Sequence, residues 1–330
     1  MSLRISRFGI AAALAAVMTL SPAAVAQNAA APAAAAQAEP SADTPIGSGP
    51  HRAVMEMEPS LPGFTFYRPA DLATSGDHSL PVVLWGNGAC ANTGNAFRAF
   101  LSEIASYGYV VIALGPINPA APIFETPHLP HAGPATAFVL PANLPPPATH
   151  TAQIIQALDW ISSRAVQATQ YRGKLNTANV AVMGMSCGGA QTIEAAADPR
   201  FKTAVIWNSG LFPGGTSMAG GRNLTKEDLN RLHAPTAYIS GDESDIAFVN
   251  ANDDYARLAQ TSLPVFRAWE RGVGHGGNYG LPNGGEFAGV GVAWLNWRLK
   301  GDQRAGLMFR GPDCGLCVNP RWVVQSSHLE

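Results

Sequence analysis

One pentapeptide in this sequence has the residue types and spacing of a nucleophile held on a sharp turn. Gly184-Met185-Ser186-Cys187-Gly188 fits the pattern G-x-S-x-G and stands between an expected strand at 180–183 and an expected helix at 188–197. A serine hydroxyl is a poor nucleophile at neutral pH, so it must be exposed while an imidazole accepts its proton. The context therefore predicts covalent catalysis by Ser186, although the pentapeptide alone also fits a glycine-rich turn with an incidental serine.

Two later segments offer an acid and a base. Asp242 and Asp245 follow the expected strand 236–240, and His275 lies on a glycine-rich loop after the expected strand 265–269. The order serine, acid, histidine is the order in which these groups follow successive strands around a nucleophile elbow. We therefore expect Ser186 to attack, His275 to act as its base, and one of the two aspartates to orient His275.

The three motifs resemble those of the α/β-hydrolase superfamily over roughly residues 60–300, nearest to its secreted polyester-hydrolase, chlorophyllase and dienelactone-hydrolase-like branch. The resemblance implies an α/β fold, with a mostly parallel central sheet and helices on both faces in a single domain. In that branch the acid is typically followed by Ile-Ala, as Asp245 is by Ile246-Ala247. The resemblance thus favours Asp245 over Asp242.

The resemblance also implies an oxyanion hole. The family uses the backbone N–H of the residue after the nucleophile, which is Cys187 here. The segment Trp85-Gly86-Asn87-Gly88-Ala89 has the position of the family's oxyanion loop but lacks its usual His-Gly start. The second donor is therefore the N–H of either Asn87 or Ala89.

The chain has four cysteines, Cys90, Cys187, Cys314 and Cys317. Cys90 and Cys187 each adjoin one half of the expected oxyanion hole, so we hypothesise a disulfide between them; two buried free thiols are the alternative. Cys314 and Cys317 have the spacing of a zinc half-site, but no second pair of ligands lies nearby. A local disulfide is the better interpretation.

Substrate contacts are less specific in the sequence. Trp207, at the end of a strand, and Phe124, on a proline-rich connection, could line an apolar acyl or aryl pocket, and ordinary core packing fits them equally well. His128, His131 and His150 share that connection without the spacing of a zinc motif. We expect neither a metal nor an organic cofactor.

The elements that must position these residues follow from hydrophobic periodicity. Short apolar runs alternate with amphipathic ones, which indicates βαβ units and one sheet. The expected strands are 81–85, 110–114, 180–183, 203–207, 236–240 and 265–269, and the expected helices are 97–106, 151–165, 188–197 and 287–299. The long connections at 116–150 and 210–233 are candidate pocket walls, because open sheets of this kind bind ligands at the carboxyl ends of their strands.

The N-terminal residues predict export. Arg4 and Arg7 precede an apolar stretch at 8–20 and the small-residue site Ala24-Val25-Ala26, so residues 1–26 are interpreted as a signal peptide. The apolar stretch is shorter than the roughly 20 residues of a membrane span. Residues 27–50 form an Ala/Pro-rich flexible tether and 51–330 the hydrolase domain. We expect a secreted or periplasmic protein without a membrane span.

Composition excludes some other classes. With 330 residues, 47% of them apolar and 13% charged, the chain can build one large core. Its formal net charge of −2 disfavours a protein that tracks nucleic-acid phosphates. The preferred hypothesis is a secreted serine hydrolase that cleaves small-molecule or polymeric carboxylic esters through an acyl-enzyme. The alternatives are an amidase, peptidase or polyamide depolymerase with the same triad, and a non-catalytic binding protein on a hydrolase scaffold.

Overall fold

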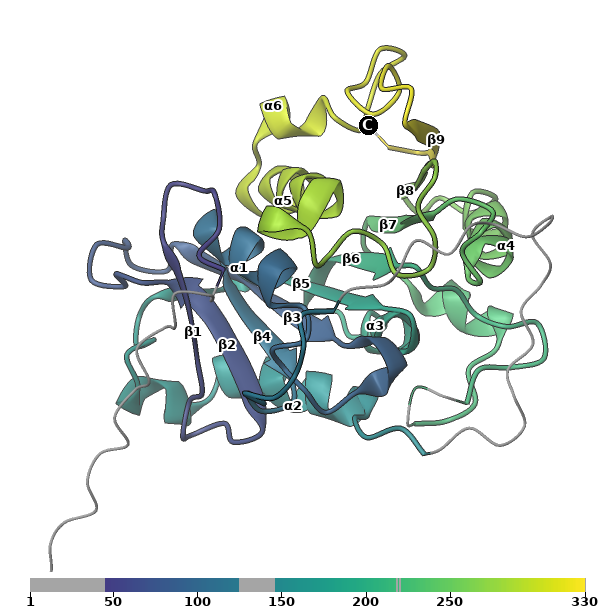
Figure 1. Ribbon diagram of the computed structural model, residues 1–330. Helices are drawn as coiled ribbons and strands as arrows, with labels where there is room; N and C mark the ends of the chain where they lie inside the picture. Colours follow the sequence, from purple (N-terminus) through teal and green to yellow (C-terminus); the bar gives the residue numbers. More distant parts are fainter. Residues whose placement is uncertain (1–44, 125–145, 218, 220, 330) are drawn as a thin grey trace, which may run out of the picture. The chain divides into compact units, whose positions relative to one another are not determined.

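The computed structural model describes residues 45–124, 146–217, 219 and 221–329, in which nine strands form one sheet (Figure 1). Their order across the sheet is β1-β2-β4-β3-β5-β6-β7-β8-β9. The strands are β1 (Ala53–Glu56), β2 (Phe64–Pro69), β3 (Leu80–Gly86), β4 (Val110–Leu114), β5 (Leu175–Met185), β6 (Phe201–Trp207), β7 (Thr236–Gly241), β8 (Val265–Glu270) and β9 (Trp322–Ser327). The strands from β4 to β8 in this order are parallel, and β1, β2 and β9 join by antiparallel pairing.

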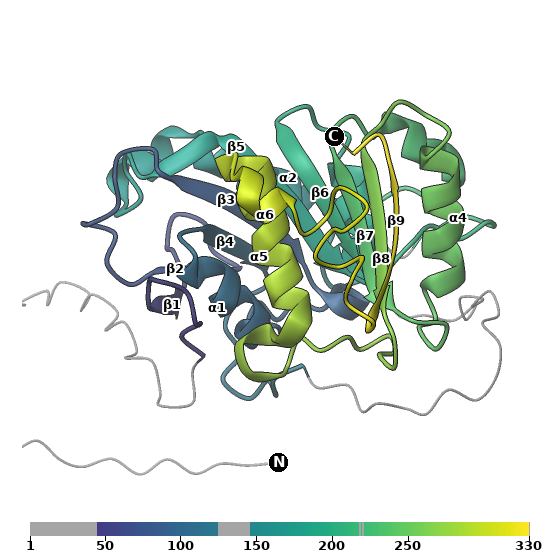
Figure 2. The same cartoon turned by 90° about the horizontal axis from the view of Figure 1, so that it is seen from above.

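Helices cover both faces of this sheet (Figure 1), and Figure 2 looks onto one of these faces. The α-helices are α1 (Arg98–Ser106), α2 (Thr151–Ile161), α3 (Cys187–Ala195), α4 (Phe248–Leu258), α5 (Gly285–Lys300) and α6 (Gln303–Gly306). The 3-10 helices are η1 (Gly88–Cys90), η2 (Arg164–Ala168), η3 (Lys226–Arg231) and η4 (Pro282–Gly284). No helix in the described ranges is long and apolar enough to cross a membrane.

Two hydrophobic cores result from the alternation of side chains along the strands. Val82 and Leu84 of β3 point into the core that α2, α3 and α4 cover. Their neighbours Val83 and Trp85 point into the opposite core, which α1 and α5 cover. Since β3 and β4 are buried on both faces, the sequence of each is a continuous apolar run rather than an alternating one. The sequence prediction of an α/β fold with one mostly parallel sheet is confirmed.

Several elements differ from the sequence-based expectations. The helix expected at 151–165 ends at Ile161. The 3-10 helix η2 follows, and the side chain of Ser163 caps its N-terminus by accepting the N–H of Ala165. The helix α4 was not anticipated, because five of the eleven residues in its sequence FVNANDDYARL carry an amide or a charge. The predicted signal peptide and nearly all of the tether lie outside the described residues.

A buried ion pair attaches η3 to α4. Nζ of Lys226 lies 2.5 Å from Oδ1 of Asp254, and the two side chains are 6% and 0% exposed. The other carboxylate oxygen of Asp254 accepts the backbone N–H of Leu211 at 2.9 Å. One charged pair thus fixes both η3 and the segment after β6 against the same helix.

This arrangement makes stability sensitive to Lys226. Lys226→Met should lower the free energy of unfolding by about 3–5 kcal/mol, because a buried carboxylate loses its cation. The double variant Lys226→Met/Asp254→Asn should recover part of the lost free energy of unfolding. The asparagine amide carries no charge, and its oxygen still accepts the N–H of Leu211. Urea denaturation measures both. Lys174→Met, which removes a cation paired with the exposed Asp77, is the control, and a loss as large as that of Lys226→Met would contradict the account.

Candidate active site

Ser186 stands on the turn between β5 and α3 with a backbone that few residues adopt. Its φ is 54° and its ψ is −117°. The turn is possible because backbone segments approach closely at the adjoining glycines: a Cβ on Gly188 would lie 2.1 Å from the carbonyl oxygen of Gly86, and one on Gly184 would lie 2.2 Å from that of Gly188. The Ser186 N–H donates to the carbonyl of Trp207 at 2.9 Å, which ties the turn to β6. This is the strained strand-to-helix turn on which a serine is presented for attack.

The structure brings Ser186, His275 and Asp245 into one hydrogen-bonded chain. The Ser186 hydroxyl donates to Nε2 of His275 across 2.9 Å. Nδ1 of His275 lies 2.6 Å from Oδ1 of Asp245, and since a carboxylate can only accept, this nitrogen carries the proton. Asp242, the alternative acid, is turned toward its own loop, where its carboxylate accepts hydrogen bonds from Ser244 and the N–H of Gly272.

The Asp245 carboxylate is buried, but it accepts several hydrogen bonds. Besides His275, it accepts the N–H of Ala247 at 2.9 Å and Nδ2 of Asn208 at 2.8 Å. Burial raises the pKa of Asp245, but the charge of His275 and these hydrogen bonds outweigh it, so that the pKa lies below the ordinary value of 3.8. The group is therefore ionised at neutral pH, as a carboxylate that orients histidine must be.

Asn208 is a member of the site that the sequence analysis did not identify. It is fully buried, directly after β6, with a left-handed backbone of φ 41°. Its Nδ2 donates to Asp245, while its Oδ1 accepts the hydroxyl hydrogen of Tyr279. A polar residue directly after a central parallel strand was the available signal, because that position adjoins the loops that carry Ser186 and Asp245.

The expected oxyanion loop forms the turn η1 after β3. The Asn87 side chain is buried and engaged, since its Nδ2 donates to the carbonyl of Leu114 and its Oδ1 accepts Nε1–H of Trp85. Ala89 is exposed at the tip of the turn, with φ 54°. Cys90 follows with φ 49°, and its N–H donates to the carbonyl of Asn87 at 3.2 Å. Two successive residues without glycine's freedom are therefore held in left-handed conformations.

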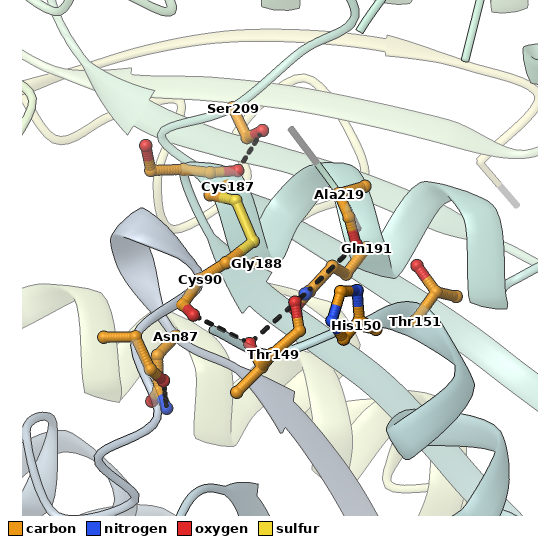
Figure 3. The surroundings of a disulfide bond; sticks show 12 residues. Asn87, Cys90, Thr149, His150, Thr151, Cys187, Gly188, Gln191, Ser209 and Ala219 are labelled. Atoms are coloured by element: carbon orange, nitrogen blue, oxygen red, sulfur yellow. Dashed lines mark hydrogen bonds between the residues drawn. A yellow bond between two sulfur atoms is a disulfide. The ribbon is translucent and has the colours of Figure 1, made fainter. Parts of the chain in front are cut away.

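A disulfide joins this turn to the residue after Ser186 (Figure 3). Cys90 and Cys187 are bonded, as we hypothesised, with Cα atoms 5.2 Å apart. The carbonyl of Cys90 also accepts both the N–H and the hydroxyl of Thr149, each at 3.0 Å. Nε2 of Gln191, on α3, donates to the carbonyl of Thr149 at 2.8 Å. The strained turn is thus held to α3 both covalently and through a buried chain of hydrogen bonds.

A small pocket opens beside Ser186. It is lined by Ser186, Ala190, Asn208, Ser209, Gly210, Phe212, Ile246, Ala247, Asn250 and His275. Ile246 stands out because this apolar side chain is 41% exposed at the mouth. The walls of the pocket come from the segments after β6 and β7.

The two residues predicted to contact substrate do not line this pocket. Trp207 is fully buried between Phe100 and Phe287, with ring centroids 5.2 and 5.5 Å away. Phe124 is half-buried and stacks on Phe97 at 4.5 Å. These positions fit the alternative of core packing. Of the three histidines on the proline-rich connection, His150 directly precedes α2, and His128 and His131 lie outside the described residues.

The second cysteine pair is also bonded, with the Cα atoms of Cys314 and Cys317 4.9 Å apart. This local disulfide lies between α6 and β9, away from the pocket lining described above. The local disulfide that the sequence interpretation preferred is thus present.

The lowered pKa of Asp245 predicts how stability depends on pH. A carboxyl with a lowered pKa stabilises the folded chain fully above its unfolded value of 3.8 and loses this contribution as pH falls through the folded value. The difference in free energy of unfolding between wild type and Asp245→Asn should therefore be constant near neutral pH and shrink below about pH 3.8. Urea titrations from pH 3 to 7 measure it, and a difference that grows on acidification would contradict the assignment.

Comparison with known proteins supports this reading of the fold. Residues 156–223, which include β5, Ser186, α3 and β6, match the model of the family described as platelet-activating factor acetylhydrolase, isoform II. A search of curated proteins gave no significant match. The parallel sheet, the strand-to-helix turn at Ser186 and this match support membership of the α/β-hydrolase superfamily.

Proposed function

We propose that the protein is a serine hydrolase that cleaves carboxylic esters through an acyl-enzyme intermediate. The observation that carries this proposal is the hydrogen-bonded chain from Ser186 through His275 to the buried Asp245, with Ser186 on the wall of a pocket. The matched family is named as an acetylhydrolase, which supports cleavage of an acyl bond. The complete triad argues against a non-catalytic binding protein.

The reaction follows from these contacts. Nε2 of His275 accepts the Ser186 proton while Oγ attacks the ester carbonyl, which gives a tetrahedral oxyanion. Asp245 stabilises the resulting imidazolium. His275 then returns the proton to the leaving alcohol as the carbonyl re-forms, which leaves an acyl-serine. Water, deprotonated by His275, cleaves that ester in the same way, releases the carboxylic acid and restores the Ser186 hydroxyl.

The oxyanion is assigned to the N–H groups of Cys187 and Ala89. Cys187 opens α3, and the N-terminus of a helix favours a developing negative charge. Ala89 is preferred over Asn87 because Ala89 is exposed at the tip of η1 whereas Asn87 is fully buried. The Cys90–Cys187 disulfide holds these two residues' segments together, so it serves to fix the spacing of the two donors.

The substrate is proposed to be an ester whose acyl part packs against apolar side chains, in a small molecule or a polymer. Phe212 and Ile246 supply apolar surface at the pocket, and the exposure of Ile246 fits contact with a large partner. Export is supported by the N-terminal residues 1–26 and by the two disulfides, which form in oxidising compartments.

Hydrolysis of a p-nitrophenyl ester series tests the proposal. Wild type should turn over, and Ser186→Ala should reduce kcat by at least about 10⁴-fold, because no other group can form the acyl-enzyme. Thermal melts confirm that the variant is folded. Wild type that is inert on every ester but cleaves p-nitroanilides would favour the amidase with the same triad, and inertness on both would favour a binding protein.

The disulfide generates a separate prediction about the oxyanion hole. Cys90→Ala/Cys187→Ala should lower kcat by about 10- to 100-fold with a small change in KM, because a donor that shifts slightly still allows substrate to bind. The matched control is Cys314→Ala/Cys317→Ala, which removes the other disulfide and should leave kcat within about twofold of wild type. Equal losses in the two variants would contradict a specific role for the Cys90–Cys187 bond.

A further inference from the structure

Asn250 presents an unusual polar group in the candidate site. It lies in the first turn of α4 and is 2% exposed, yet its Nδ2 has no hydrogen-bond partner. Its Oδ1 accepts no hydrogen bond from any described residue either. A buried amide without partners is costly, so its presence at this position calls for an explanation.

The backbone at Asn250 is held in place by its surroundings. Its backbone carbonyl accepts Nζ of Lys226 at 3.3 Å, and the same ammonium is paired with Asp254 on the next turn of α4. Gly210 packs directly on this helix, since a Cβ there would lie 2.6 Å from the backbone nitrogen of Ala251. The helix backbone at Asn250 is thus fixed from two sides.

The unpaired amide lines the same pocket as Ser186 and His275. Two other polar residues in this lining are already engaged: Asn208 with Asp245 and Tyr279, and Ser209 through its hydroxyl, which donates to the carbonyl of Ser186. Most of the remaining lining is apolar or glycine. The pocket therefore combines apolar walls with one buried amide that no described residue satisfies.

We propose that Asn250 is a specificity-determining residue that hydrogen-bonds a hydroxyl group on the acyl part of the substrate. A hydroxyl both donates and accepts, so it satisfies the amide in either orientation of Asn250. Hydroxyacyl esters are therefore the substrate class. A site built to pair with a substrate hydroxyl discriminates strongly against an analogue that lacks it. This inference rests on the proposed ester hydrolysis.

The test compares esters of equal shape. The p-nitrophenyl esters of 2- and 3-hydroxybutanoic acid are each paired with the 2- or 3-methyl analogue, in which a methyl replaces the hydroxyl. Wild type should favour the hydroxy ester of one pair by about 10-fold or more in kcat/KM. Asn250→Leu and Asn250→Ala should both reduce that ratio to near one, because kcat/KM for the hydroxy ester should fall more than kcat/KM for the methyl ester.

Stability and a matched variant complete the experiment. Because the amide is unpaired in the free protein, Asn250→Leu should melt at the wild-type temperature or above it. The control Asn230→Leu changes an exposed asparagine on η3 and should keep the wild-type ratio. A wild-type ratio near one on both pairs, or a ratio that survives both Asn250 variants, would overturn the inference while ester hydrolysis stands. Inertness toward all four esters would overturn the proposed function itself.

Discussion

The close backbone approach at the Ser186 turn is the constraint on which the rest of the site depends. With φ at 54° and ψ at −117°, Ser186 leaves β5 and enters α3 within one residue. Only glycines at 184 and 188 let the neighbouring carbonyls come so near. Such strain persists only where surrounding structure holds it. The Ser186 turn is held by the hydrogen bond to the Trp207 carbonyl on one side and by the Cys90–Cys187 disulfide on the other.

Several charged side chains of the structure are buried. Among them are Asp245, Asp254 and Arg267 of β8. Burial lowers the pKa of Arg267 to about 10 even though both carboxylates and Tyr238 attract its charge. Its guanidinium also lies 5.1 Å from the centre of the Trp269 ring. The carboxylate that orients His275 thus belongs to a larger group of compensating charges.

Much of this arrangement could be predicted from sequence because its signals are local. Apolar runs marked every central parallel strand, and the residue types that follow β5, β7 and β8 indicated Ser186, Asp245 and His275. The unpredicted parts depend on tertiary context. Helix α4 was missed because it carries Asp254, whose partners Lys226 and Leu211 come from distant segments. Trp207 looked like a substrate contact, although packing against α1 and α5 buries it. Asn208 carries no motif; its sequence signal was its position directly after β6, and its contacts with Asp245 and Tyr279 form only in the fold.

The central claim is that Ser186 is an activated nucleophile. The most direct measurement is to treat the folded protein with a fluorophosphonate, which phosphonylates serine only where a base and an oxyanion hole activate it, and to map the adduct by peptide mass spectrometry. The account predicts one phosphonyl group per chain, on Ser186, with loss of fluoride. A folded protein that takes up no reagent, or takes it up at another residue, would contradict the account.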